Sequence, residues 1–279
     1  NGLNADGIPT FTDITREIGL EIDERTLGAI FSDLDHDNDL DLYIANDGQP
    51  NRLYLNEASD NEYGFTFVDT YDTSGVNDRG SGMGVSSGDW TGDSRFDLMV
   101  TNWDRELNAI YRNNTDEAGY PNFIYSTYRI GMLGLGNNMT GWGVHFADLD
   151  HDTDLDLMTV NGRVPVVNFE SDAELIRLYG NRLAEGYEGQ FREWTQLIGL
   201  DDIGTRMARG SALADFDNDG DLDLAVNAIG GEATLLQNQD PAGNWLMVDF
   251  GQSLAGTRLT ATLADGTVLE REVHIGSSY

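Results

Sequence analysis

Four Asp-rich segments carry carboxylates at a spacing suited to binding a divalent cation. Each follows the pattern D-x-[DT]-x-D-x-x-x-D, and the first aspartates are Asp33, Asp89, Asp148 and Asp215. Side-chain oxygens at positions 1, 3, 5 and 9, with the backbone carbonyl of position 7, can converge on one ion within a tight loop. A cation of calcium size accepts about six to eight oxygens, whereas magnesium demands a stricter octahedron and retains more water. The spacing therefore predicts calcium sites.

Three of the four segments carry the full set of expected ligands, with position 7 contributing its backbone carbonyl. They are loop 1, with Asp33, Asp35, Asp37, Asp39 and Asp41; loop 3, with Asp148, Asp150, Asp152, Asp154 and Asp156; and loop 4, with Asp215, Asp217, Asp219, Asp221 and Asp223. Loop 2 differs, because threonine replaces the second carboxylate and arginine stands at position 7; its residues are Asp89, Thr91, Asp93, Arg95 and Asp97. We expect up to four Ca²⁺, with the loop 2 site the weakest or empty.

The loops do not match the helix–loop–helix calcium motif, which places a Glu at position 12. This chain has apolar or β-branched residues there: Ile44, Val100, Thr159 and Val226. Each loop is therefore expected to lead into a strand. Loop 3 is expected to turn differently from the others, because the β-branched Thr153 at position 6 resists a left-handed backbone.

The alternative interpretation is that these aspartates are solvated turn residues on an acidic surface, which is the usual fate of an Asp run. Four copies at nearly the same internal spacing favour metal binding instead. Five acidic side chains in one short loop repel one another strongly unless a dication neutralises them.

The sequence around the loops repeats as well. A Gly lies five residues before each first Asp, at Gly28, Gly84, Gly143 and Gly210. A Phe-rich segment precedes each unit, at 11–20, 65–76, 123–133 and 191–200, and a short segment ending in Asn follows each loop, at 51–56, 108–113, 177–181 and 233–238. Each unit offers about four short β-patterned stretches broken by Gly, Asn and Asp. The chain is therefore predicted to be all-β, a β-propeller of four-stranded antiparallel blades, with repeats at about 10–57, 65–114, 123–182 and 190–239.

Composition excludes several classes of function. The chain has 49 Asp plus Glu against 16 Lys plus Arg, a net charge of −33, so neither nucleic acid nor membrane insertion is expected. It contains neither Lys nor Cys, which excludes a Schiff-base lysine, disulfides, thiolate nucleophiles and cysteine zinc sites. The chain begins NGLNADG without Met, and we expect a processed or trimmed product.

The repeats resemble the FG-GAP/VCBS calcium repeats of integrin-α-like β-propellers. The stretch NWLMVDFGQSLAGTRLTATLADGTVLEREVHIGSSY (244–279) is similar to the start of an ASPIC/UnbV domain, including its Gly-Ser-Ser-Tyr ending. Together these features are similar to the cartilage acidic protein family over nearly the whole chain. The resemblance implies a repeat region at 1–240 and an incomplete ASPIC/UnbV-like β segment at 241–279. It also implies a secreted or cell-surface, calcium-stabilised propeller that contacts matrix, cells or polysaccharide, without established catalysis.

Two functions remain open at this stage. The first is a non-enzymatic extracellular calcium-binding scaffold or adhesion protein with an extracellular protein or polysaccharide as its partner. Such propellers usually close with about seven blades, and because an arc of four exposes unpaired strand edges, self-association is also expected. The alternative is a glycan-binding or polysaccharide-active propeller, a lyase or hydrolase, although no acid is singled out for catalysis.

Five other residues invite a functional interpretation. Ser86 lies in a G-x-S-x-G motif but aligns with the repeat, so it is not expected to be a nucleophile. His36 and His151 are expected to be solvated, and Asn113 stands in a glycosylation sequon, as does Asn138.

Overall fold

The computed structural model describes residues 6–20, 23–131, 135–239, 243–250 and 255–273. Within these residues the chain folds into antiparallel sheets, and the single short helix is the 3₁₀ turn η1 (Leu200–Ile203). In this part of the chain no helix has the length and apolar character needed to cross a membrane. The predicted all-β class is therefore confirmed.

Three sheets have four strands each, in sequence order, and a fourth sheet has three. Blade 1 contains β1 (Thr26–Ser32), β2 (Asp41–Asn46), β3 (Arg52–Ala58) and β4 (Phe65–Asp69), and blade 2 contains β5 (Val85–Gly88), β6 (Asp97–Val100), β7 (Ala109–Asn113) and β8 (Phe123–Tyr125). Blade 3 contains β9 (Gly141–Ala147), β10 (Asp156–Asn161), β11 (Arg177–Asn181) and β12 (Phe191–Glu193), and blade 4 contains β13 (Ala208–Ala214), β14 (Asp223–Ala228) and β15 (Thr234–Leu236). Antiparallel four-stranded sheets are thus confirmed for blades 1 to 3, and among the described residues blade 4 has three strands.

The second strand of each blade begins at the position-9 aspartate and continues as an apolar run. The strands β2 (DLYIAN) and β10 (DLMTVN) are buried almost throughout. Blade 3 lies between blades 2 and 4, and on the outer face of blade 1 Leu42 of β2 packs with Ile18 of the N-terminal segment. β-branched and long apolar residues suit such a strand.

The hydrophobic cores lie between successive blades. Tyr43 and Leu53 of blade 1 pack with Leu98 of blade 2, and the same relation recurs between blades 2 and 3 and between blades 3 and 4. The repeated glycine of the first strand permits this packing, since a Cβ at Gly28 would collide with the carbonyl oxygen of Met83 in the next unit. Each blade is therefore stabilised chiefly by its neighbours.

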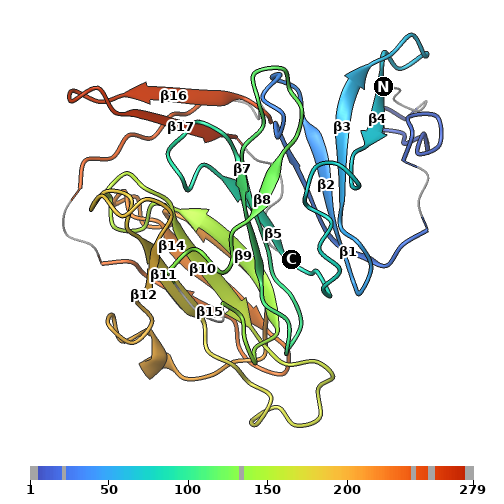
Figure 1. Ribbon diagram of the computed structural model, residues 1–279. Coiled ribbons are helices and arrows are strands. Elements are labelled where there is room, and N and C mark those ends of the chain that lie inside the picture. The colour runs from blue at the N-terminus through green and yellow to red at the C-terminus, as the bar shows by residue number, and fades with distance from the viewer. Residues whose placement is uncertain (1–5, 21–22, 132–134, 240–242, 251–254, 274–279) are drawn as a thin grey trace.

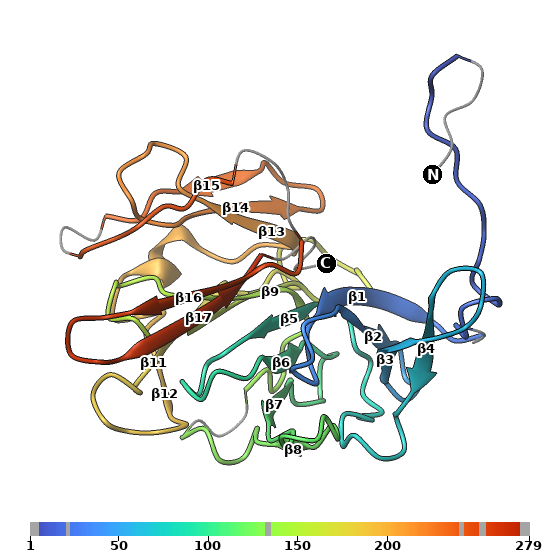
Figure 2. The same cartoon turned by 90° about the horizontal axis from the view of Figure 1, so that it is seen from above.

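The four sheets fan out in an arc and do not close into a ring within the described residues (Figure 2). A final hairpin, formed by β16 (Arg258–Thr262) and β17 (Val268–Glu272), lies across one end of the blades (Figure 1). It falls within the stretch that resembles an ASPIC/UnbV segment, whose Gly-Ser-Ser-Tyr ending lies outside the described residues.

Candidate metal centre

Each Asp-rich loop connects the first and second strands of its blade and is closed by the same hydrogen bonds. The carboxylate at position 1 accepts backbone N–H bonds from positions 5 and 6, as Asp33 does from Asp37 (3.0 Å) and Asn38 (3.1 Å). Loops 2 and 4 repeat both bonds, and loop 3 shows the bond from Thr153 to Asp148 (3.1 Å).

The backbone at position 6 is left-handed in all four loops, at Asn38, Ser94, Thr153 and Gly220. Loop 3 therefore turns as the others do, and the expectation drawn from its threonine is wrong. The position-1 aspartate accounts for this, because its bond to the Thr153 N–H offsets the conformational strain.

The position-9 aspartate braces the loop against the rest of the blade. One oxygen of Asp41 accepts the N–H of Leu34 (2.8 Å) and the other accepts the N–H of Asn56 (3.0 Å), in the third strand. Asp97, Asp156 and Asp223 make the equivalent pairs of bonds. Position 9 thus fixes the loop to the third strand in every blade.

A repeated asparagine, in the third strand or just after it, connects a blade to the loop of the preceding blade. The side-chain amide of Asn113 donates to the carbonyl of Leu34 (2.8 Å), at position 2 of loop 1. Asn181 donates in the same way to Trp90 of loop 2 (2.8 Å), and Asn238 to Leu149 of loop 3 (2.8 Å). We did not assign these asparagines a role from sequence, although their recurrence at the end of each third-strand segment was the available signal.

Loops 1, 3 and 4 bring three carboxylates together. One oxygen from each member lies within 4.8 Å of the others in the sets Asp33, Asp35 and Asp37; Asp148, Asp150 and Asp152; and Asp215, Asp217 and Asp223. Loops 1 and 3 also contain buried carboxylate oxygens with no hydrogen-bond partner among the described residues: Oδ1 of Asp35, Asp39, Asp148 and Asp154. Converging anionic oxygens that lack donors fit a hard divalent cation.

Loop 2 does not form such a cluster within the described residues. Its central carboxylate, Asp93, is instead 3.2 Å from the Arg112 guanidinium and 3.7 Å from that of Arg95. Thr91 donates its hydroxyl to Asp97 (3.2 Å) rather than presenting a carboxylate. Arginine thus supplies positive charge to the loop whose ligand set is poorest.

The carboxylates of loops 1 and 3 are poorly stabilised as anions. Burial, followed by the charges of Asp37 and Asp33, raises the pKa of Asp35 to about 7. Burial also raises the pKa of Asp41 and of Asp156 to about 8, although backbone hydrogen bonds to each carboxylate act in the opposite direction. The pKa of Asp154 is raised to about 7 for the same first reason. A bound dication would offset this cost of ionisation.

The β16–β17 hairpin brings cationic and acidic side chains to the loops. Arg258 forms an ion pair with Asp33 (2.6 Å), and Arg271 donates to the carbonyl of Thr153 in loop 3 (3.1 Å). Glu272 accepts bonds from the Ser32 hydroxyl (2.7 Å) and the Asp33 N–H (3.0 Å). Nothing in the sequence predicted these contacts, because hairpin and loops are more than a hundred residues apart.

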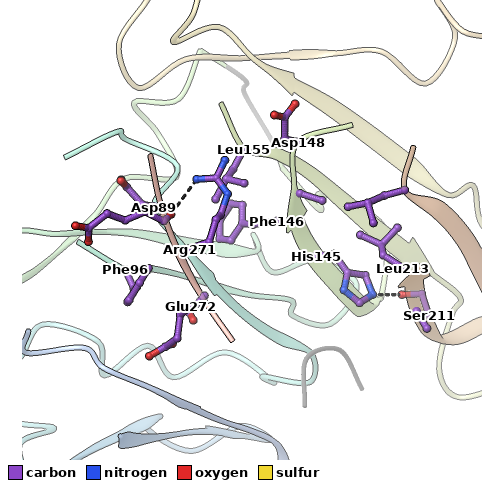
Figure 3. Close-up of a pocket in the computed structure, with 16 residues that line it drawn as sticks. Asp89, Phe96, His145, Phe146, Asp148, Leu155, Ser211, Leu213, Arg271 and Glu272 are labelled. Atoms are coloured by element: carbon purple, nitrogen blue, oxygen red, sulfur yellow. Dashed lines mark hydrogen bonds between the residues drawn. The ribbon is translucent and has the colours of Figure 1, made fainter. Parts of the chain in front are cut away.

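The hairpin also covers a central cavity of about 440 Å³ lined by the first strands of blades 2 to 4. Arg271 and Glu272 approach it from one side, and on the other His145 of β9 lies 3.0 Å from the Ser211 hydroxyl (Figure 3). Burial lowers the pKa of His145 to about 4, so this imidazole is neutral at physiological pH.

The other residues singled out in the sequence are mostly buried in the protein interior. Ser86 is buried in β5, where its hydroxyl accepts the N–H of Phe146 (3.2 Å). His151 is largely buried, with Nδ1 3.5 Å from an Asp221 oxygen, so the expectation that it is solvated is wrong. Asn113 is also buried, which leaves Asn138 as the exposed sequon.

Comparison with known proteins agrees with the repeat structure. A family model described as FG-GAP-like repeat matches residues 33–100. Cartilage acidic protein 1 of Mus musculus is 24% identical over 282 residues, covering 98% of this chain and 41% of the relative. The Xenopus tropicalis protein of the same name is 25% identical over 285 residues, with the same two coverages. The chain thus spans about two fifths of the length of these curated relatives. Residues 33–100 therefore match an FG-GAP-like repeat, and the chain over most of its length is similar to cartilage acidic protein 1.

Proposed function

We propose that the chain is a calcium-binding scaffold in which loops 1, 3 and 4 each hold one Ca²⁺ and loop 2 binds it most weakly. The observation that carries the proposal is the convergence of three carboxylates in each of those loops, with unpartnered buried oxygens in loops 1 and 3. Residues at positions 1, 3 and 5 would supply side-chain ligands, position 7 its carbonyl and position 9 a further carboxylate. Calcium there would stabilise the loop that joins the first two strands of each blade.

The protein is proposed to act outside the cell, as a non-enzymatic adhesion or matrix component that contacts an extracellular protein or polysaccharide. The FG-GAP-like repeats and the similarity to cartilage acidic protein 1 support this role. The large negative charge of the chain favours a cationic partner surface, or one bridged by calcium.

The test is calcium titration of the metal-free protein by calorimetry, with melting curves in calcium and in chelator. A ligand that binds only the folded state stabilises it by about 2.7 kcal/mol per site at a hundred times its dissociation constant. We expect three strong binding events and a large rise in the melting midpoint. Absence of binding in millimolar calcium, with the fold intact, would overturn the proposal.

Two variants assign the effect to the loops. Asp35→Asn removes a charge whose ionisation is disfavoured by burial, so its melting midpoint in chelator should equal or exceed that of the parent protein at pH 8. In calcium it should lose one strong binding event and gain less stability than the parent. Asp60→Asn, which changes an exposed aspartate outside the loops, is the matched control and should bind as the parent does.

The glycan-active alternative is separated by a glycan array and a turnover assay on acidic polysaccharides. The tryptophans do not favour it, because Trp90 and Trp142 are buried while Trp103 and Trp194 pack against the core between blades 3 and 4. Trp245 is half exposed. Turnover would refute the scaffold, whereas binding without turnover would identify a polysaccharide partner.

A further inference from the structure

Blade 4 differs from the other blades because its outer edge is open. Within the described residues β15 pairs with β14 on one side only, whereas the third strand of each other blade also pairs with a fourth. Leu236 of β15 is only partly buried, although the equivalent residues Tyr54, Tyr111 and Tyr179 are 5% exposed or less. An exposed apolar strand edge is a site for adding a strand.

The fourth strand enters the other blades in one register. Its phenylalanine lies opposite the repeated asparagine of the third strand, in the pairs Asn56 and Phe67, Asn113 and Phe123, and Asn181 and Phe191. The same phenylalanine donates its N–H to a carbonyl in the turn before the blade, at Ile18, Ser74 and Ile130. Phe67, Phe123 and Phe191 are all buried.

Blade 4 has a corresponding site for a fourth strand, but no fourth strand occupies it among the described residues. The residue equivalent to Ile18 and Ile130 is Ile198, which is 56% exposed, whereas those two are buried. A cavity of about 670 Å³ lies beside it, lined largely by apolar side chains that include Trp194, Leu200, Leu213 and Leu235. This site therefore offers both a strand edge and an apolar pocket.

The N-terminal segment has the pattern of a fourth strand. The spacing Phe11, Thr15 and Gly19 matches Phe123, Thr127 and Gly131, and also Phe191, Thr195 and Gly199. Its turn packs on blade 1, since Ile18 accepts the N–H of Phe67 (2.8 Å), but Phe11 is 97% exposed. This dark blue segment lies on the far side of the molecule from β15 in both views (Figures 1 and 2).

We propose that the N-terminal segment of a second copy of this chain adds to β15 as the fourth strand of blade 4. The register of the other blades places Phe11 of one copy opposite Asn238 of the other, and Thr12 opposite Gln237. Phe11 then fills the apolar cavity, and its N–H donates to the carbonyl of Ile198. The association is head to tail and is independent of the proposed calcium binding.

A second feature agrees with the proposed contact between the two copies. Asn113, Asn181 and Asn238 each donate to a loop carbonyl in the preceding blade, but within the described chain no blade precedes Asn56. In the head-to-tail pair Asn56 faces blade 4 of the other copy, where the equivalent carbonyl belongs to Phe216.

The first test is the mass of the 279-residue chain in solution, measured by light scattering. We expect two chains per particle, reduced to one by Phe11→Asp, which alters a side chain that is exposed in the single copy and so leaves folding intact. Ile8→Asp, at another exposed apolar residue outside the matched pattern, is the control and should retain the parent mass. A monomeric parent protein, or a mass that Phe11→Asp does not reduce, would overturn the proposal.

The second test fixes the register and distinguishes exchange between chains from closure within one chain. Because the chain has no cysteine, Thr12→Cys and Gln237→Cys can be made as separate proteins and mixed under mild oxidation. Residues directly opposite in an antiparallel pair have Cβ atoms about 4.5–5.5 Å apart, close enough for a disulfide after a small adjustment. A disulfide-linked heterodimer is expected, and the pair Ile8→Cys and Gln237→Cys should not form one. Cross-linking confined to a single chain carrying both cysteines would refute exchange between copies.

Discussion

Replacing Asn181 with alanine should destabilise the protein far more than the equivalent change at Asn56. The Asn181 amide donates to the carbonyls of Trp90 (2.8 Å) and Leu155 (3.1 Å), and its oxygen accepts the N–H of Arg182 (2.8 Å). Asn56 makes the same backbone bond to its loop, but no blade precedes it in the described chain, and its side-chain oxygen lacks a partner there. Both substitutions remove the same side-chain atoms. Asn181→Ala breaks three side-chain hydrogen bonds, whereas Asn56→Ala breaks none among the described residues.

The magnitude follows from the bonds removed. A neutral hydrogen bond contributes about 0.5–1.5 kcal/mol net, and leaving a buried carbonyl without its donor costs about 1–3 kcal/mol. With two buried carbonyls affected, Asn181→Ala should lower the free energy of unfolding by about 2–4 kcal/mol. Asn56→Ala should cost less than about 1 kcal/mol, because only weak packing is lost.

The assay is urea unfolding of both variants and the parent protein at one calcium concentration and again in chelator. The difference between the variants should persist in chelator, because the bond runs from a side chain to a backbone carbonyl and not through a metal ligand. Similar losses for Asn181→Ala and Asn56→Ala would refute the reasoning that these asparagines join one blade to the next. The Asn56 comparison is best made at protein concentrations where the chain is monomeric.

Two further predictions concern the loops and the turns between blades. Because burial raises the pKa of Asp41 and Asp156 to about 8, the metal-free folded chain holds protons that the unfolded chain releases above about pH 4, so its melting midpoint should fall from pH 5 to pH 8. The calcium-loaded protein should keep its midpoint over that range, and a chelator curve that rises with pH would contradict the assignment. Gly75→Ala should cost about 2 kcal/mol or more beyond Gly64→Ala in urea unfolding, since both glycines have a left-handed backbone but only at Gly75 would a Cβ collide with the Phe123 carbonyl. Equal losses would show that backbone strain alone, and not the close approach of the strand, requires glycine there.

The repeated features of the fold were predictable because local sequence determines them. The Asp-rich pattern located all four loops, and the apolar runs after Asp41 and its equivalents gave the strands that follow. These features depend on spacing over a few residues, which is visible in each unit and is reinforced by repetition. The position-6 backbone in loop 3 was mispredicted because the intrinsic preference of Thr153 was weighed without the hydrogen bond that holds it.

The features that involve distant parts of the chain were not predictable. The ion pair of Arg258 with Asp33 and the bonds from Glu272 to the start of loop 1 join residues more than two hundred positions apart, with no motif that relates them. The burial of His151 likewise depends on Asp221 and Gly220 of the adjacent blade. Patterns within a repeat do not specify which charged side chains neighbouring elements will bring to its loops.

The position of the hairpin in the sequence has a consequence for biosynthesis. Because Arg258 and Glu272 are translated after all four blades, blades 1 to 3 leave the ribosome with their acidic loops uncovered. Domains generally acquire structure from the N-terminal end during synthesis, and contacts of large sequence separation form slowly. We therefore expect the nascent chain to form its sheets first. The β16–β17 hairpin, which carries Arg258 and Arg271, docks last and completes folding.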